Sequence, residues 1–179
     1  MPSVLTHAAP ALALIPFFRA PGVPARLWAL GVACAMAPDL DVLAFRLGIS
    51  YDDLLGHRGL WHSIPFAALF AALVTLAAFP VARPAFSRVR AFAFLFLATA
   101  SHGLLDMLTN GGLGVALWSP LENERRFFAF RPIEVSPLDV RAFLSPRGLA
   151  ILANEARWVW LPCIALACLR TVVRRRAGG

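Results

Sequence analysis

Five apolar segments alternate with polar stretches along the 179-residue chain. They run from about Leu5 to Phe18, Ala25 to Ala37, Ser63 to Val81, Ala91 to Leu108 and Trp158 to Val173. A helix needs about 20 apolar residues to cross the hydrocarbon core of a bilayer, so the third segment has spanning length and the first two are shorter. Proline and glycine mark the joins, as in "RAPGVPAR" and "PVARP". The pattern predicts an all-α, polytopic integral membrane bundle of about five helical segments.

The stretch from Thr109 to about Ala156 breaks this pattern. It is polar, rich in glycine, proline and charge, and contains "NGG", "SPLENERR" and "SPR". We expect one long extramembrane loop there, with room for short helices. No internal repeat or second compositional region occurs, so residues 1–179 are predicted to form a single domain. The amino-terminal "MPSVLTHAAPALALIPFF" lacks the basic start and clear cleavage site of a signal peptide, and we expect it to remain as a helix.

Composition also indicates a membrane protein. Charged residues make up 15% of the chain, whereas soluble domains contain about 25%. The mean hydropathy is +0.69. All seventeen basic residues are arginine, which excludes a Schiff-base lysine and a P-loop lysine. Cys34, Cys163 and Cys168 lie inside apolar segments without CxxC spacing, and we expect them to be small core residues.

The arginines predict the orientation in the membrane. Three groups flank the apolar segments: Arg19 and Arg26; Arg83, Arg88 and Arg90; and Arg170, Arg174, Arg175 and Arg176. Alternating helices place all three groups on one side, which is the cytoplasm by the positive-inside rule, and the long loop on the periplasmic side. The net charge of +7 is therefore interpreted as a topology signal, and no nucleic-acid partner is expected.

All four histidines lie at or near the predicted outer ends of the apolar segments, together with several carboxylates. These residues are His7, Asp39 and Asp41 in "PDLD", His57 and His62 in "GHRGLWHS", and His102 and Asp106 in "SHGLLD". Ionisable groups near the membrane core are costly unless they pair or bind something. We therefore predict a metal site formed by the four histidines with Asp39 and Asp106.

The spacing of these residues supports a shared site. His102 and Asp106 are four residues apart, so they project from one face of a helix and can hold one ion. His57 and His62 can meet only if the glycine-flanked stretch around His57 is a loop and His62 begins the next helix, with Ser63 as its N-cap. A mixed imidazole and carboxylate set suits zinc, manganese or iron, whereas magnesium and calcium favour oxygen ligands.

Three further residues are candidates for a direct catalytic role. Pro38 allows Asp39 and Asp41 to turn out of the preceding helix, and either carboxylate could act as the general base. Arg58 has two interpretations of equal weight: an ion pair with one of these aspartates, or a contact with a phosphate or developing oxyanion.

Other polar residues near the predicted site also have two interpretations. Glu155 is either a further metal ligand or an acid at a helix start, favoured by the helix dipole. For Arg125 and Arg126, solvated charges or headgroup contacts are favoured over binding of a substrate phosphate. Trp158 and Trp160 are typical of an interfacial aromatic belt.

The order of these motifs resembles a known family. An early histidine in "THAAPAL", then "PDLD", "HRGLWHS" and "HGLLDMLTNGG", followed by "LWSPLENERRFFAFRPI", is similar to the YdjM-like, LexA-regulated inner-membrane metal-dependent hydrolases of bacteria, over about residues 3–140. More distantly, the resemblance extends to zinc-dependent phospholipase C and S1/P1 nucleases, which are helical enzymes with clustered zinc ions. It implies metal roles for His7, Asp39, His57 or His62, His102 and Asp106. The chain lacks the amino-terminal tryptophan and the second histidine paired with glutamate of those enzymes, which argues against a full three-zinc site.

The predicted function is hydrolysis of an ester, with a phosphoester favoured, in a lipid or lipid-linked substrate. One or two zinc ions would lower the pKa of bound water to about 7, and manganese or iron would fit the same donors. The alternatives are a metal-ion transporter and a non-catalytic scaffold stabilised by metal. A transporter needs polar groups near mid-membrane, and the third and fifth segments have almost none away from their ends, with Thr75 the main exception.

Overall fold

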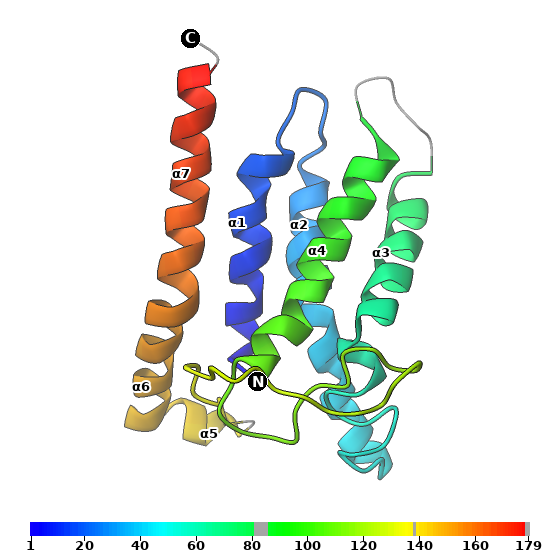
Figure 1. Ribbon diagram of the computed structural model, residues 1–179, viewed down its shortest axis with the longest axis vertical. Coiled ribbons are helices and arrows are strands. Elements are labelled where there is room, and N and C mark those ends of the chain that lie inside the picture. Colours follow the sequence, from blue (N-terminus) through cyan, green and yellow to red (C-terminus); the bar gives the residue numbers. More distant parts are fainter. Residues whose placement is uncertain (81–85, 138, 178–179) are drawn as a thin grey trace.

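The computed structural model describes residues 1–80, 86–137 and 139–177, which form a bundle of helices with an irregular layer across one end (Figure 1). The helical elements are η1 (Val4–His7), α1 (Ala8–Phe18), α2 (Arg26–Met36), η2 (Ala37–Leu47), η3 (Leu60–His62), α3 (Ile64–Ala78), α4 (Arg88–Met107), α5 (Val140–Phe143), α6 (Pro146–Glu155), η4 (Ala156–Trp160) and α7 (Leu161–Ala177). The elements η1, η2 and η3 are 3₁₀ helices, and η4 is a π-helical turn. No β-strand occurs among these described residues, so the predicted all-α fold is confirmed.

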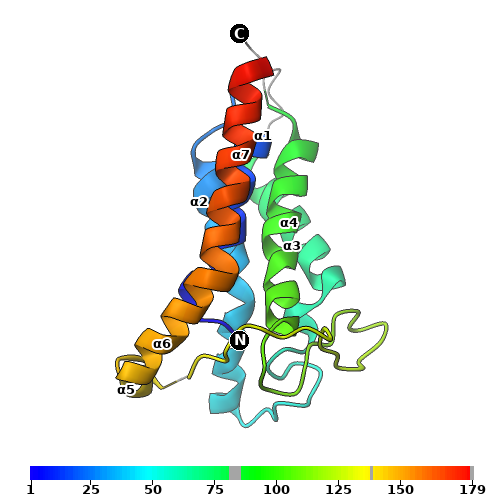
Figure 2. The same cartoon turned by 60° about the vertical axis from the view of Figure 1, so that its left-hand side comes forward.

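The central helix of the bundle is α4. It packs against α1, α2 and α3, while α7 contacts the bundle through α1. Figures 1 and 2 show α7 on the outside of the bundle, with the carboxyl terminus at one end and the η elements and irregular layer at the other. The two ends of the molecule are therefore built from different kinds of structure.

Three helical stretches are long and apolar enough to span a bilayer: Arg26–Leu47, Arg88–Met107 and Pro146–Ala177. In the first of these η2 continues α2, and in the last α6, η4 and α7 follow one another. The stretches Val4–Phe18 and Ile64–Ala78 are apolar but shorter.

Two of the predicted segment boundaries are wrong. The third segment was expected to reach Val81, which lies outside the described residues, but α3 ends at Ala78 because Phe79 precedes a proline and leaves the helical conformation. The polar loop was expected to continue to about Ala156, but the helix α6 already begins at Pro146. Proline is well tolerated in the first turn of a helix, so Pro146 is compatible with this start.

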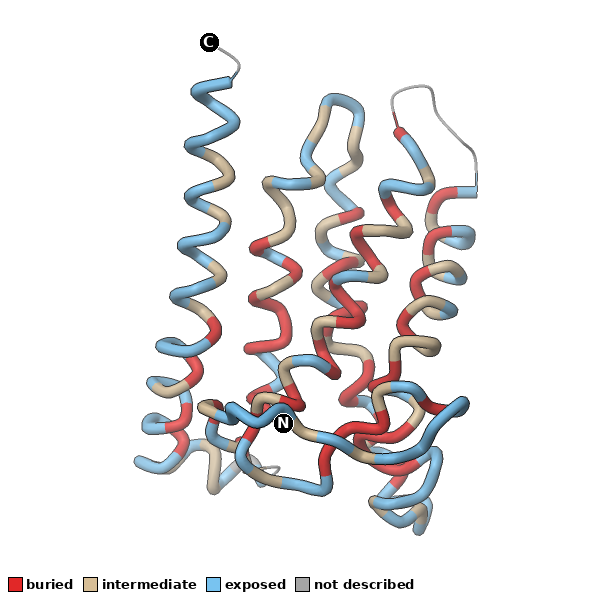
Figure 3. Tube along the Cα trace, viewed as in Figure 1, coloured by how far each residue is buried: buried red, intermediate tan, exposed pale blue. Residues whose placement is uncertain are grey.

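Burial is concentrated in α4 and at the junction with the irregular layer, whereas α7 is largely exposed (Figure 3). No residue of α7 is fully buried, because this helix meets its neighbours along one side only. Cys34 is buried, as predicted, but Cys163 is half-buried and Cys168 is exposed, so the core prediction is wrong for Cys168. Exposed apolar side chains on such a helix are expected where lipid takes the place of water.

α2 and α4 pack tightly against each other at Gly31 and Phe94. The Phe94 ring is fully buried and lies edge-on to Phe18 and Trp28, with centroid distances of 5.3 and 5.1 Å. A Cβ atom at position 31 would lie 2.2 Å from Phe94 Cε1, so only glycine fits this contact. Small residues serve this purpose generally where membrane helices pack closely.

Replacing Gly31 with alanine should lower thermal stability in detergent by about 1–3 kcal/mol, because the overpacking outweighs the gain in helix propensity. The same substitution in a Phe94→Leu background should cost much less, since the clashing ring is gone. Thermal unfolding of the four proteins of this double-mutant cycle measures the coupling. A Gly31→Ala penalty that is equal in both backgrounds would contradict this packing.

Candidate metal centre

Four of the predicted ligands reach one buried region from three helical elements. His7 is the last residue of η1, Asp39 lies in the first turn of η2, and His102 and Asp106 are one turn apart on the buried side of α4. The predicted common face of His102 and Asp106 is thus confirmed. The His7 and His102 rings are stacked, with centroids 3.6 Å apart.

The stretch "GHRGLWHS" brings in His62, although His62 does not begin the next helix as predicted, because α3 begins at Ile64. The residues around His57 form turns, His62 ends η3, and the Ser63 hydroxyl caps α3 by accepting a hydrogen bond from the backbone N–H of Phe66 at 3.1 Å. Gly103 allows α4 to approach this stretch, because a Cβ there would lie 2.3 Å from the carbonyl oxygen of His62. The role of Gly103 was missed by the sequence analysis, although its position next to His102 is visible in "SHGLLD".

Three imidazole Nε2 atoms face two carboxylates in this region. His7 Nε2 lies 3.7 Å from both Asp39 Oδ2 and Asp106 Oδ1. His62 Nε2 lies 3.4 Å from Asp106 Oδ2, and His102 Nε2 lies 3.2 Å from Asp39 Oδ1. Ligand atoms of Asp39, His62, His102 and Asp106 all lie within 4.8 Å of one another. Nitrogen and carboxylate donors in this number are typical of a zinc, manganese or iron site.

Two of the imidazoles turn their Nε2 atoms toward each other. His102 Nδ1 lies 2.7 Å from the carbonyl oxygen of Ala35, which can only accept, so the proton is on Nδ1. His62 Nδ1 lies 3.1 Å from Asp41 Oδ2. The two Nε2 atoms are 3.0 Å apart. Two lone pairs at this distance repel each other unless a proton or a metal ion lies beside them.

Several converging atoms also lack hydrogen bonds. His7 Nε2 and both carboxylate oxygens of Asp39 and Asp106 are buried without a hydrogen-bond partner in the described part of the chain. Buried polar atoms left without partners destabilise a fold by roughly 1–3 kcal/mol each. All of these atoms are electron-pair donors, so a bound metal ion would supply the partner that they lack.

The cluster carries an excess of negative charge. Asp39, Asp41 and Asp106 are buried and contribute three negative charges, and Arg58 contributes one positive charge, which leaves two negative charges when the histidines are neutral. The amino group of Met1 lies 4.0 Å from Asp106 Oδ1, but burial lowers its pKa to about 6, so it is mostly uncharged at neutral pH. A divalent cation would balance this charge.

The pKa of His62 reflects the same electrostatic field. Burial alone would lower it, but the carboxylates of Asp106, Asp39 and Asp41 together raise the pKa of His62 well above its usual range. The site thus favours a positive charge beside His62, supplied by a proton or by a metal ion.

Arg58 is a structural partner of this cluster. Its Nε lies 3.0 Å from Asp106 Oδ2, while Nη1 donates to the Gly111 carbonyl at 2.8 Å and Nη2 donates to Thr109 Oγ1 at 3.0 Å. Its backbone has a φ of 62°, which is strained for a residue other than glycine. Of the two predicted roles, the structure shows an ion pair, although with Asp106 rather than with an η2 aspartate.

Asp41 lies on the Nδ1 side of the His62 ring, and His57 contacts Asp41. His57 Nδ1 is 2.7 Å from Asp41 Oδ1, and the backbone N–H of Arg58 donates to Asp41 Oδ2 at 3.1 Å. Asp41, His57 and His62 form a second group whose ligand atoms are close enough to hold a metal ion. The contact of Asp41 with His62 Nδ1 also matches the carboxylate–histidine pairs that orient metal ligands. The predicted ligand role of His57 therefore concerns this second group and not the cluster around His102.

Glu155 anchors the segment that carries His7. Its buried carboxylate accepts hydrogen bonds from Ser3 Oγ at 2.6 Å and Thr6 Oγ1 at 2.7 Å, and Trp160 Nε1 donates to the same Thr6 hydroxyl at 2.9 Å. These contacts correct the two interpretations of Glu155, as a metal ligand and as an acid at a helix start, because Glu155 is the last residue of α6 and its carboxylate is occupied by Ser3 and Thr6. No local pattern marks Ser3 or Thr6, because their partner lies near the other end of the sequence.

Arg125 stabilises the loop around His57 through hydrogen bonds to its backbone. Its Nη1 donates to the His57 carbonyl at 2.8 Å, and its Nη2 donates to the Tyr51 carbonyl at 2.8 Å. Its partial burial lowers the pKa of Arg125, and the expectation of a solvated charge is wrong for this residue. Arg126 is exposed and pairs with two neighbouring glutamates, as expected of a solvated charge.

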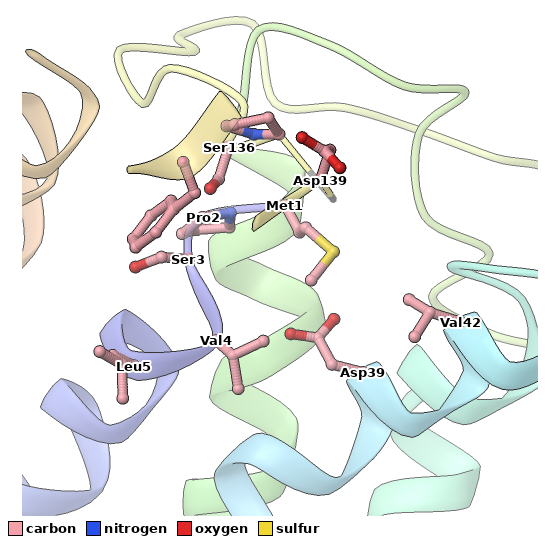
Figure 4. Close-up of a pocket in the computed structure, with 11 residues that line it drawn as sticks. Met1, Pro2, Ser3, Val4, Leu5, Asp39, Val42, Ser136 and Asp139 are labelled. Carbon is pink, nitrogen blue, oxygen red and sulfur yellow. The ribbon is translucent and has the colours of Figure 1, made fainter. Parts of the chain in front are cut away.

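A pocket of about 270 Å³ reaches Asp39 from the side of the amino-terminal segment (Figure 4). Val4, Val42 and Phe143 contribute apolar walls, and Ser136 contributes a polar group. Figure 4 shows the Asp39 carboxylate turned toward the Met1 side chain within this pocket. The pocket therefore borders the cluster at Asp39.

Comparison with known proteins agrees with the sequence motifs. The YdjM inner membrane protein family matches residues 1–177. Inner membrane protein YbcI of Escherichia coli (strain K12) is 38% identical over 168 residues, which cover 93% of this chain and 95% of that relative. No solved structure matches the chain. With its motifs, its apolar helices and this relative in agreement, the chain belongs to the YdjM inner membrane protein family.

Proposed function

We propose that this inner membrane protein is a metal-dependent hydrolase. The observation that carries the proposal is the convergence of three Nε2 atoms and two carboxylates in a buried region that holds three carboxylates and one guanidinium group. The donors are His7, Asp39, His62, His102 and Asp106. A buried site of this composition next to an open pocket resembles a catalytic metal centre more closely than a structural one, because a structural site is closed to small molecules.

Zinc is the ion proposed for the cluster, and manganese or iron would fit the same donors. When bound, such an ion lowers the pKa of a coordinated water to about 7 and polarises the bond to be hydrolysed. Asp39 faces the pocket, so one of its oxygens is placed to accept the proton of the attacking water. Asp41 holds the His62 ring, and Arg58 holds Asp106 and offsets its charge.

The pocket favours an amphiphilic substrate. Its walls are mostly apolar, while Asp39, Ser136 and Asp139 supply polar groups close to the cluster. A second groove of about 420 Å³ is lined by apolar residues such as Leu43 and Trp61, and also by Asp41. An ester or phosphoester within a lipid or lipid-linked molecule would place its polar linkage at the cluster and its chain against these surfaces.

A metal-stabilised scaffold is the closer rival, and a transporter fits less well. All ten carboxylates fall in residues 39–53 and 106–155, at the end of the bundle that contains the cluster. Buried hydroxyls of Thr75 and Thr99 lie further along the bundle, but each donates to a carbonyl of its own helix. A transporter would need ligands along both halves of a path.

Replacement of His102 by alanine should remove most of the bound metal, because it deletes a donor from the centre of the cluster. Thr99→Ala, one turn earlier on α4 and also buried, is the matched control and should retain the metal. Elemental analysis of both proteins after purification in detergent measures the difference. Wild-type metal content in folded His102→Ala protein would remove His102 from the site.

Enzymatic turnover separates the hydrolase from the scaffold. Reconstituted protein should hydrolyse a fluorogenic lipid ester or phosphodiester, and a chelator should abolish the reaction. His57→Ala should lower kcat/KM by about 10–100-fold, since His57 supports Asp41 behind the ligand His62. Asp53→Asn, in the exposed part of the same loop, should behave as wild type. A protein that binds zinc and gains stability from it but turns over neither lipid class would support the scaffold.

We propose from the arginine distribution that the cluster lies on the periplasmic side. A periplasmic reporter inserted near Gly112 should therefore be active, and one fused after Arg176 should be inactive. A cytoplasmic reporter at the same two positions should give the opposite pattern. The reverse result would move the centre, and its substrate, to the cytoplasmic face.

A further inference from the structure

The end of the bundle opposite the metal centre carries arginine without carboxylates. Neither aspartate nor glutamate occurs in residues 1–38, 54–105 or 156–179, which include all of α1, α3 and α7. The described arginines of this end are Arg19, Arg26, Arg88, Arg90, Arg170, Arg174, Arg175 and Arg176. Because these residues supply no acid to pair with them, their counter-charges must come from outside these segments.

Some of these charges surround a cavity of about 400 Å³ between the ends of α1 and α7. Its lining residues are Ile15, Pro16, Arg19, Thr171, Arg174 and Arg175. Arg174 Nη1 donates to the carbonyl oxygen of Arg19 at 2.6 Å, which ties the two helix ends together at the cavity. Three arginines and one threonine thus line the cavity together with the apolar residues Ile15 and Pro16.

A second, shallower cavity of about 310 Å³ adjoins the first along α7. The two share Thr171 and Arg175, and the second adds Ala167, Cys168 and Val172. Cys168, Val172 and Arg175 follow one face of the helix, since they are spaced four and three residues apart. The basic cavity therefore continues into an apolar strip on α7 that runs toward the middle of the bundle. This arrangement is complementary to a charged headgroup with an attached acyl chain.

We propose that these joined cavities form a binding site for one anionic phospholipid. Its phosphate lies among Arg19, Arg174 and Arg175, because guanidinium groups match phosphate oxygens with paired hydrogen bonds. One acyl chain follows the apolar strip on α7. Basic pockets between membrane helices bind such headgroups in other proteins. Since α7 contacts the bundle chiefly through α1 and has no fully buried residue, the lipid also joins α7 to α1. The site is independent of the metal centre.

The test uses the full chain, purified in detergent and stripped of lipid, with phosphatidylglycerol, phosphatidylcholine of the same chain length, and inorganic phosphate as probes. Phosphatidylglycerol should raise the melting temperature and remain bound at one molecule per chain in native mass spectrometry. Phosphatidylcholine and phosphate should do neither. Arg175→Gln should weaken the binding of phosphatidylglycerol about fivefold, whereas Arg176→Gln, the adjacent residue outside both cavities, should not.

A second pair of variants tests the chain-binding strip without removing charge. Cys168→Trp should fill the strip and weaken lipid binding, while Leu169→Trp, which is exposed and lines neither cavity, should not. Equal stabilisation by the two phospholipids, or full stabilisation by phosphate alone, would overturn the proposal. Equal losses in Arg175→Gln and Arg176→Gln would also overturn it, because they would indicate a diffuse surface charge.

Discussion

The structure depends on one electrostatic constraint, which is the placement of three carboxylates in a buried region with a single guanidinium partner. Charges of one sign are rarely tolerated at such depth without a counter-ion. Imidazole nitrogens turned toward the same point add lone pairs and no fixed charge, so they increase the need for a cation. Hydrogen bonds to groups outside the cluster, such as that of His102 to Ala35, hold the rings in this arrangement.

The 3₁₀ and π-helical elements of the molecule lie around the buried carboxylates or next to residues that position them. η1, η2 and η3 each contribute a histidine or aspartate to the site, and the π-helical turn η4 directly follows Glu155, which anchors η1. Short 3₁₀ and π segments often mark functional positions, because they redirect side chains at a cost in hydrogen-bond geometry. The left-handed backbone of Arg58 is a further local strain of this kind, and Arg58 is held there by the ion pair with Asp106.

Local patterns in the sequence were sufficient to predict the fold class and most of the residues that lie together in the candidate cluster. Apolar segments predicted the helices, and the position of histidines at segment ends predicted which residues would meet. The placement of Ser63 as an N-cap and the common face of His102 and Asp106 followed from spacing within one helix. Contacts between distant segments were not predictable in this way. The partners of Arg58 and Glu155, and the need for glycine at position 103, depend on how helices approach one another in three dimensions.

The molecule is electrically polarised along the bundle. Carboxylates and histidines occupy one end, and the other end is rich in arginine and free of acids. This separation of charge has a different consequence at each end of the bundle. At the first end the surplus negative charge is buried, so only a small cation that enters the protein can balance it. At the second end the surplus positive charge borders the membrane surface, so larger anions such as lipid headgroups can approach it from outside. The apolar middle of the bundle keeps the two kinds of charge apart, since ion pairs between the ends would have to cross hydrocarbon.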